Sequence, residues 1–172
     1  MKLPPHWKDW ISPLLLALVL LAGVWYYRPV SIDGLCPGLE PSAVSVHVRC
    51  TSGTQAQPER EGRIQAAADA PEGRAVLERL EGLSFRRPPT NLLYHILSPT
   101  ATGYQVQAGD YRFTIHLYGE SGQVLSLAYS NGRWSYTTPG HGSFLPCHMK
   151  DGAAKGQALG AELLELSEDL HS

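Results

Sequence analysis

The feature that most constrains this chain is a long apolar run from Ile11 to Tyr27, which contains no charged residue. A run of about 17 residues is at the short end of the lengths that cross ~30 Å of hydrocarbon. Tryptophan and tyrosine residues lie on both sides of its centre, as expected where a membrane helix meets the lipid headgroups. They are Trp7, Trp10, Trp25, Tyr26 and Tyr27. The run therefore predicts a single transmembrane helix over residues 11–28.

The flanking residues predict where this helix begins and ends. Ser12 before Pro13 is typical of an N-cap followed by a first helical position that tolerates proline. Pro29 is expected to end the helix.

Two alternatives compete with an uncleaved anchor. The first is a cleaved secretory signal, but Leu21-Ala22-Gly23 places a bulky leucine where the cleavage site needs a small residue. The second is a buried core helix, but core helices seldom lack polar residues on every face. We therefore favour the uncleaved anchor.

Basic residues flank the run unequally, because Lys2 and Lys8 precede it and Arg28 follows it. Since basic residues gather on the cytoplasmic side of membrane helices, this bias predicts an inward-facing N-terminus at the cell membrane. The predicted parts are a cytoplasmic segment (1–10), the membrane helix (11–28), a turn-rich tether (29–42) and an extracytoplasmic domain (43–172). The predicted partners are the lipid bilayer, through residues 11–28, and a membrane or envelope protein.

The charge balance gives no electrostatic case for nucleic-acid binding. The 172 residues carry a formal charge of -2, and only 17% of them are charged. Beyond residue 28, eleven Lys and Arg stand against fifteen Asp and Glu. A mildly acidic domain lacks the positive surface that phosphate backbones attract.

The segment from Ala43 to Thr51 alternates between apolar and polar residues, which predicts a half-buried strand. Its apolar positions are Val44, Val46, Val48 and Cys50. The polar stretch Ser52–Gly62 is predicted to be a loop, and Ile64–Asp69 to add a short helical turn.

A helix is predicted next, with Asp69 as its cap, Pro71 in its first turn and Gly82 as its terminator. Val76, Leu77 and Leu80 form its apolar stripe.

The second half of the chain has the pattern of an antiparallel meander of about four strands. The predicted strands are Gly103–Ala108, Tyr111–Tyr118, Gln123–Tyr129 and Arg133–Thr138, with a shorter segment at Tyr94–Leu97. Asn131-Gly132 predicts a type I′ hairpin turn, which needs positive φ at both central residues. A final helix over Ala153–Leu170 would cover the sheet with its leucine stripe. The expected fold class is α+β: strand, helix, meander and C-terminal helix, after the membrane helix.

The cysteines are odd in number: Cys36, Cys50 and Cys147. Outside the cytoplasm one disulfide is permitted, and Cys50–Cys147 and Cys36–Cys147 are both open. Three unpaired thiols are the alternative, with Cys50 a small core residue.

The loop that holds His141, Cys147 and His148 is the nearest approach to a catalytic constellation. Cysteine and histidine could act as nucleophile and base, or hold a metal. Neighbours in sequence rarely point at one another, however, and no zinc-type pair of clusters is present. We predict neither a metal nor a cofactor, and favour a Gly- and Pro-rich loop at the sheet edge.

A last group lies on the meander. Arg112, His116 and Tyr118 could line a shallow groove with Trp134 and Tyr136, since aromatic residues beside arginine suit a partner surface. The alternative, which the alternation favours, is that Trp134 and Tyr136 cap the core.

No known catalytic motif is found in the sequence. The leading hypothesis is a membrane-anchored extracytoplasmic interaction or ligand-sensing module. The alternative is a thiol- or metal-dependent envelope enzyme centred on Cys147 and His148.

Overall fold

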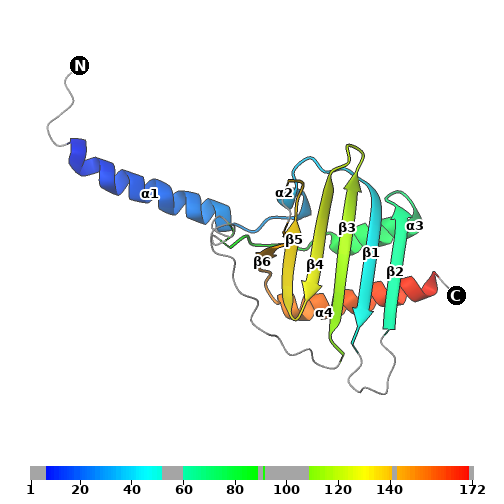
Figure 1. The fold of residues 1–172 in the computed structure, drawn as a ribbon. Coiled ribbons are helices and arrows are strands. Elements are labelled where there is room, and N and C mark those ends of the chain that lie inside the picture. The colour runs from blue at the N-terminus through cyan, green and yellow to red at the C-terminus, as the bar shows by residue number, and fades with distance from the viewer. Residues whose placement is uncertain (1–6, 52–59, 89–90, 92–108, 141–142, 171–172) are drawn as a thin grey trace.

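The computed structural model describes residues 7–51, 60–88, 91, 109–140 and 143–170, and for residues 7–11 it describes the backbone alone. Its centre is a six-stranded antiparallel sheet with the strand order β2-β1-β3-β4-β5-β6 (Figure 1). The strands are β1 (Pro41–Cys50), β2 (Arg60–Ala67), β3 (Tyr111–Gly119), β4 (Val124–Ser130), β5 (Arg133–Thr137) and β6 (Leu145–Cys147). The helices are α1 (Trp7–Tyr27), α2 (Ile32–Leu35), α3 (Pro71–Leu80) and α4 (Gly152–Asp169). The predicted α+β class is confirmed.

Helices α3 and α4 cover one face of the sheet and leave the other open (Figure 1). The alternation of each strand sets the two faces, because successive side chains point to opposite sides. In β1, for example, Val44, Val46 and Val48 are buried against the helices. Helix α4 contributes Leu159, Leu163 and Leu164 to the same core.

Two glycines let α4 lie unusually close to the sheet. A Cβ at Gly156 would run into the Tyr129 ring, and one at Gly160 into Tyr111. The Tyr129 hydroxyl donates a hydrogen bond to the Ala153 carbonyl at 2.9 Å, which fixes the helix over that ring. The predicted C-terminal helix is confirmed, and its close packing depends on these small residues.

The hairpin predicted at Asn131-Gly132 is present, with φ of 58° and 72°. It joins β4 to β5, as expected. The segments Tyr94–Leu97 and Gly103–Ala108, predicted as strands, lie outside the described residues.

Two predictions of local structure were wrong. Residues 60–67 form β2, which pairs with β1 over its whole length, rather than a loop and a helical turn. The loop before the last helix contains β6, a three-residue edge strand. Pro146 is tolerated there because one side of an edge strand has no neighbouring strand, so a missing backbone N–H donor breaks no hydrogen bond between strands.

The ends of two helices also differ from the prediction. Helix α3 has Ala70 rather than Asp69 at its N-cap, and no side chain caps it. Helix α1 already includes Trp7, so that Pro13 lies inside it and Ser12 is not its cap. Its end at Tyr27, shortly before Pro29, agrees with the prediction.

The segment 29–42, predicted as a tether, is packed into the domain at several of its positions. Val30 exchanges two backbone hydrogen bonds with Phe85, each 2.8 Å long, and Leu35 and Leu39 are buried. Helix α2 lies in the same segment, with Ser31 as its N-cap. The domain therefore begins almost directly after α1.

Helix α1 projects away from the sheet on the side of β5 and β6 (Figure 1). Within the described part of the chain, no helix combines the length and the apolarity that a membrane crossing requires. The helix itself is thus confirmed, whereas its crossing of a bilayer is not supported and stays a prediction.

Candidate functional site

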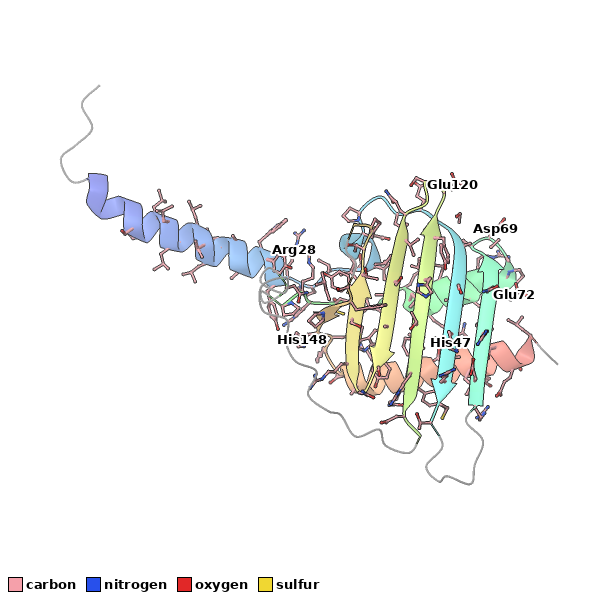
Figure 2. The ribbon with its side chains drawn as sticks, viewed as in Figure 1. Arg28, His47, Asp69, Glu72, Glu120 and His148 are labelled. Carbon is pink, nitrogen blue, oxygen red and sulfur yellow. The ribbon has the colours of Figure 1, made fainter. Side chains whose placement is uncertain are left out.

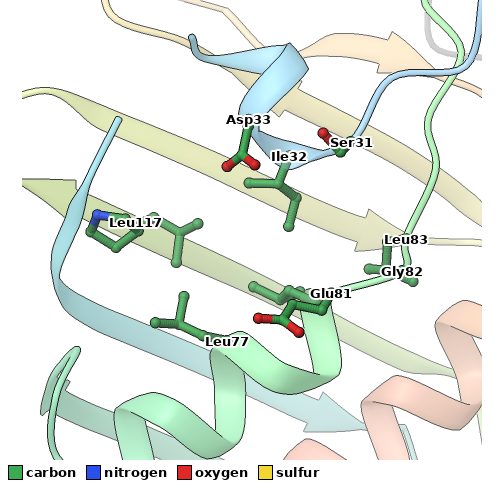
Figure 3. Close-up of a pocket in the computed structure, with 10 residues that line it drawn as sticks. Ser31, Ile32, Asp33, Leu77, Glu81, Gly82, Leu83 and Leu117 are labelled. Atoms are coloured by element: carbon green, nitrogen blue, oxygen red, sulfur yellow. The ribbon is translucent and has the colours of Figure 1, made fainter. Parts of the chain in front are cut away.

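A pocket of about 350 Å³ lies between α2, the end of α3 and the sheet (Figure 3). Its apolar lining comes from Ile32, Pro41, Leu77, Leu80, Leu83 and Leu117. The carboxylates of Asp33, from α2, and Glu81, from the end of α3, both point toward this space (Figure 3). An apolar floor beside two carboxylates suits an apolar group that carries a positive charge.

Local sequence explains why the pocket has this shape. The Ser31 hydroxyl accepts a hydrogen bond from the Gly34 amide at 3.4 Å, which begins α2 and orients Asp33. Gly82, at a φ of 77°, turns the chain away after α3 and leaves Glu81 at the rim. Only a residue without a side chain adopts this backbone conformation at little cost.

The second candidate is the side of the sheet that faces away from α3 and α4, here called the open face. Its side chains are almost all polar. They are Ser45, His47 and Arg49 from β1, Glu61, Arg63 and Gln65 from β2, Arg112, Thr114, His116 and Tyr118 from β3, Ser126, Ala128 and Ser130 from β4, and Arg133, Ser135 and Thr137 from β5. Figure 2 views this face, with His47 labelled on β1.

Glu61 is bound by three basic side chains on the open face. Its carboxylate lies 2.8 Å from His47 Nε2, 3.1 Å from Arg49 Nη2 and 2.9 Å from Arg63 Nη2. The hydrogen bonds from Arg63 and His47 lower the pKa of Glu61 to about 2. Glu61 is therefore a fixed negative charge at neutral pH.

Arg49 and Arg112 lie directly opposite each other on β1 and β3, and Glu61 is the partner of Arg49 on its other side. Like charges placed directly opposite on one face of a sheet destabilise it. Beside this pair is a hollow of about 270 Å³, whose open-face residues are His47, Arg49, Arg112, Thr114, Ala128 and Ser130. Arg112 Nε is buried there and has no hydrogen-bond partner among the described residues.

The sheet separates the five residues predicted to line one groove. Arg112, His116 and Tyr118 lie on the open face, where the His116 Nδ1 and the Ser126 hydroxyl share a hydrogen bond of 2.7 Å. Burial lowers the pKa of His116, which favours its neutral form.

Trp134 and Tyr136 lie on the opposite, helix-covered face and are only 2% and 4% exposed. The Trp134 indole donates a hydrogen bond to the Gly152 carbonyl at 2.7 Å and packs edge-on against Phe85 and Phe113. These two aromatic residues belong to the core, as the alternative interpretation expected, and do not join the groove.

The three cysteines are free thiols, so neither pairing left open by the sequence, Cys50–Cys147 or Cys36–Cys147, is present. Cys50 ends β1 and Cys147 ends β6, and three strands lie between them. At ~4.8 Å per strand this separation far exceeds the reach of a disulfide.

Cys147 is also poorly suited to catalysis. It is buried, and burial raises the pKa of its thiol to about 12, so that the nucleophilic thiolate is scarce at neutral pH. The adjacent His148 is exposed on the other side of the chain, and His141 lies outside the described residues. Among the described residues no cluster of three or more His, Cys, Asp or Glu is placed to hold a metal ion.

Glu61 and Arg63 were not predicted as site residues, because Glu61 was assigned to a loop and Arg63 lay between that loop and a predicted helical turn. The signal was present, since Gly62, Ile64 and Ala66 alternate with these polar residues. Two of the three apolar positions are small, which hid the strand period.

Comparison of the chain with protein-family models, with curated proteins and with solved structures gives no match.

Proposed function

We propose that this protein is a membrane-anchored interaction or ligand-binding module, with α1 in the lipid bilayer and the domain outside the cytoplasm. The observation that carries the proposal is the surface of α1. Its leucine and valine side chains are each more than half exposed: Leu14, Leu15, Leu16, Leu18, Val19, Leu20, Leu21 and Val24. Because they lie on every side of the helix, α1 needs an apolar environment all round it.

A lipid environment is favoured over a protein partner by the residues at the end of α1. Arg28 lies 4.7 Å from the centre of the Trp25 ring, Arg86 lies 5.5 Å from that of Tyr27, and Arg87 lies 5.0 Å from that of Tyr26. We call these six residues the collar. Tryptophan, tyrosine and arginine side chains of this kind are enriched where helices meet lipid headgroups.

The length of α1 is compatible with this arrangement. Its 21 residues rise about 31 Å at 1.5 Å per residue, close to the ~30 Å thickness of a hydrocarbon core. The collar, to which the labelled Arg28 belongs, would then lie at one headgroup layer, where α1 joins the domain (Figure 2). The orientation rests on Lys2 and Lys8 before the helix against Arg28 after it.

The domain offers two surfaces for a partner or ligand, the acidic-rimmed pocket beside α3 and the open face. An enzymatic role has less support, because the thiol of Cys147 is buried and protonated at neutral pH. The interaction hypothesis is therefore the one that the geometry favours.

A pair of reporter fusions tests the anchor and its orientation together. A reporter active only outside the cytoplasm is fused after residue 172 of the full chain, and a second fusion carries it before residue 1. We expect activity from the C-terminal fusion alone, and recovery of the protein in the membrane fraction after alkaline extraction. Activity from both fusions or neither, or release by alkali, would contradict a membrane-spanning α1.

A matched pair of variants shows whether the apolar surface causes the membrane binding. Leu18→Arg places a charge in the middle of α1 and should release the protein from membranes. Glu120→Arg places the same side chain in the exposed turn between β3 and β4 and should not. Equal behaviour of the two variants would overturn the assignment of α1 as the anchor.

A further inference from the structure

The open face carries an arrangement of charges that its own residues do not balance. Four arginines lie on the described strands of this face, Arg63 on β2, Arg49 on β1, Arg112 on β3 and Arg133 on β5, and the carboxylate that these strands place among them is that of Glu61. Glu61 contacts Arg49 and Arg63 but lies one strand away from Arg112. Among the described residues, neither Arg112 nor Arg133 makes an ion pair with an acidic side chain, and Arg112 is the one that lies opposite Arg49.

The register makes this imbalance specific. Arg112 is the direct cross-strand partner of Arg49, so the backbone pairing of β1 and β3 places two arginine residues next to each other on one face of the sheet. Such a like-charge pair is unfavourable on its own, and an anion between the two groups would reverse the sign of the interaction. Guanidinium groups also present paired donors that match the oxygens of a phosphate.

The hollow beside the pair supplies further donors. Thr114 from β3 and Ser130 from β4 line it, each with a side chain that carries a hydroxyl, and Ala128 contributes only a methyl group. Its volume of about 270 Å³ exceeds what one phosphate group needs. Arg112 Nε is buried at this place without a partner among the described residues, although a buried donor normally has one.

From these observations we infer that the open face binds a phosphate-type oxyanion between Arg49 and Arg112, with Thr114 and Ser130 as additional donors. The inference deepens the proposed function by naming the ligand class of the domain, and it rests on that function for its biological setting alone. The phosphate group is recognised by paired guanidinium donors and hydroxyls, as in other anion sites built from side chains.

The position of the site favours a soluble phosphate-bearing ligand over a lipid headgroup. Helix α1 leaves the domain beside β5 and β6, whereas Arg49 and Arg112 lie on β1 and β3, toward the other edge of the sheet (Figure 1). The open face is a side of the domain and not its membrane-facing end. A ligand can therefore reach it from the aqueous phase.

The test uses the full chain in micelles of an uncharged maltoside detergent, with inorganic phosphate as the probe. Phosphate is titrated against chloride at constant ionic strength while the amide resonances of residues 112, 114 and 130 are followed by NMR. We expect saturable shifts at these residues and a weakening of at least tenfold in Arg112→Gln. Arg74→Gln, which removes an exposed arginine from α3, is the matched control and should bind as the parent chain does.

The absence of a saturable response, or equal binding by Arg112→Gln, would overturn the inference. If Arg112→Gln does not fold, the variant Ala128→Glu is used instead. It places a carboxylate in the hollow and should abolish the response to phosphate. Unchanged phosphate binding by Ala128→Glu would overturn the inference. A response to nanodiscs of phosphatidylglycerol but not to inorganic phosphate would overturn the proposal that the ligand is soluble. The phosphate titration is done in detergent micelles and does not depend on whether α1 spans a bilayer. A failure of membrane anchoring can therefore be told apart from a failure of phosphate binding.

Discussion

The guanidinium carbon of Arg87 lies 5.0 Å from the centre of the Tyr26 ring, so the last turn of α1 rests on the segment that follows α3. Arg86 makes the corresponding contact with Tyr27 at 5.5 Å. The same segment is held to the sheet by Arg86, whose backbone exchanges two hydrogen bonds with His148. The apolar helix is therefore joined to the core through two neighbouring arginines.

The contact between Arg87 and Tyr26 predicts a measurable coupling. Arg87→Ala should lower the free energy of unfolding of the full chain by about 0.5–1 kcal/mol, the usual size of an exposed cation–π contact. Tyr26→Leu should cost a similar amount, and the double variant should cost less than the sum of the two. Urea unfolding in detergent micelles measures all three, with Arg74→Ala as the control. Strictly additive losses would show that the two side chains do not interact.

The close approach of α4 to the sheet predicts that Gly156→Ala destabilises the domain. The new methyl group would overlap the Tyr129 ring, and overpacking of this kind costs about 1–3 kcal/mol, more than the gain in helix propensity. Thermal unfolding followed by circular dichroism should show a lower Tm. Gly23→Ala in α1 is the matched control, because nothing lies within 4 Å of its added Cβ. An unchanged or raised Tm for Gly156→Ala would contradict this packing of α4 on the sheet.

The environment of Glu61 predicts a pH dependence of stability. Its pKa falls from 4.5 to about 2 on folding, because Arg63 and His47 donate hydrogen bonds to the charged form. The stabilisation is fully present above pH 4.5 and is lost as the pH falls through about 2. The difference in unfolding free energy between the parent chain and Glu61→Gln should therefore shrink from pH 5 to pH 2. Glu120→Gln, which removes an exposed carboxylate from the β3–β4 turn, is the matched control.

The cysteines predict an order of chemical labelling. Cys50 is half-buried, whereas Cys147 is buried with a pKa raised to about 12, so iodoacetamide should modify Cys50 first in the folded chain. Mass spectrometry of tryptic peptides over time measures the order. After unfolding in urea without a reductant, all three cysteines should react. A pair that reacts only after reduction would reveal a disulfide and contradict the structure.

Strong periodic patterns explain which parts of the fold the sequence predicts. In β1 and β3, large apolar residues alternate with polar ones, and Asn131-Gly132 can hardly form anything but a tight turn. Strand β2 lacks this signal because α4 fills the space beside it. A Cβ at Gly62 would lie 2.7 Å from Ser167 Cβ and 3.1 Å from Leu164 Cδ1, so the strand keeps a glycine where an apolar side chain would have marked it.

The candidate site was predicted only in part for the same reason. Arg112 was identified from the alternation of β3, but its neighbours depend on the register of three strands. Without β2, neither Glu61 nor its place beside Arg49 could be inferred. For Trp134 the alternation favoured the buried face but left the groove open, because an aromatic residue in a strand fits either side of a sheet.

The short connection between α1 and the domain has a consequence for how a partner is met. Only Arg28 and Pro29 separate the end of α1 from Val30, whose backbone is already bonded to Phe85. A long, disordered leash would let the domain sample a wide volume and any orientation. Here the connection is too short for the domain to move far from the end of α1. The distance at which it can contact a partner is therefore set by the size of the domain. With α1 anchored in a bilayer as we propose, the short connection would hold the surfaces of the domain close to the membrane and would favour partners that lie in the same membrane.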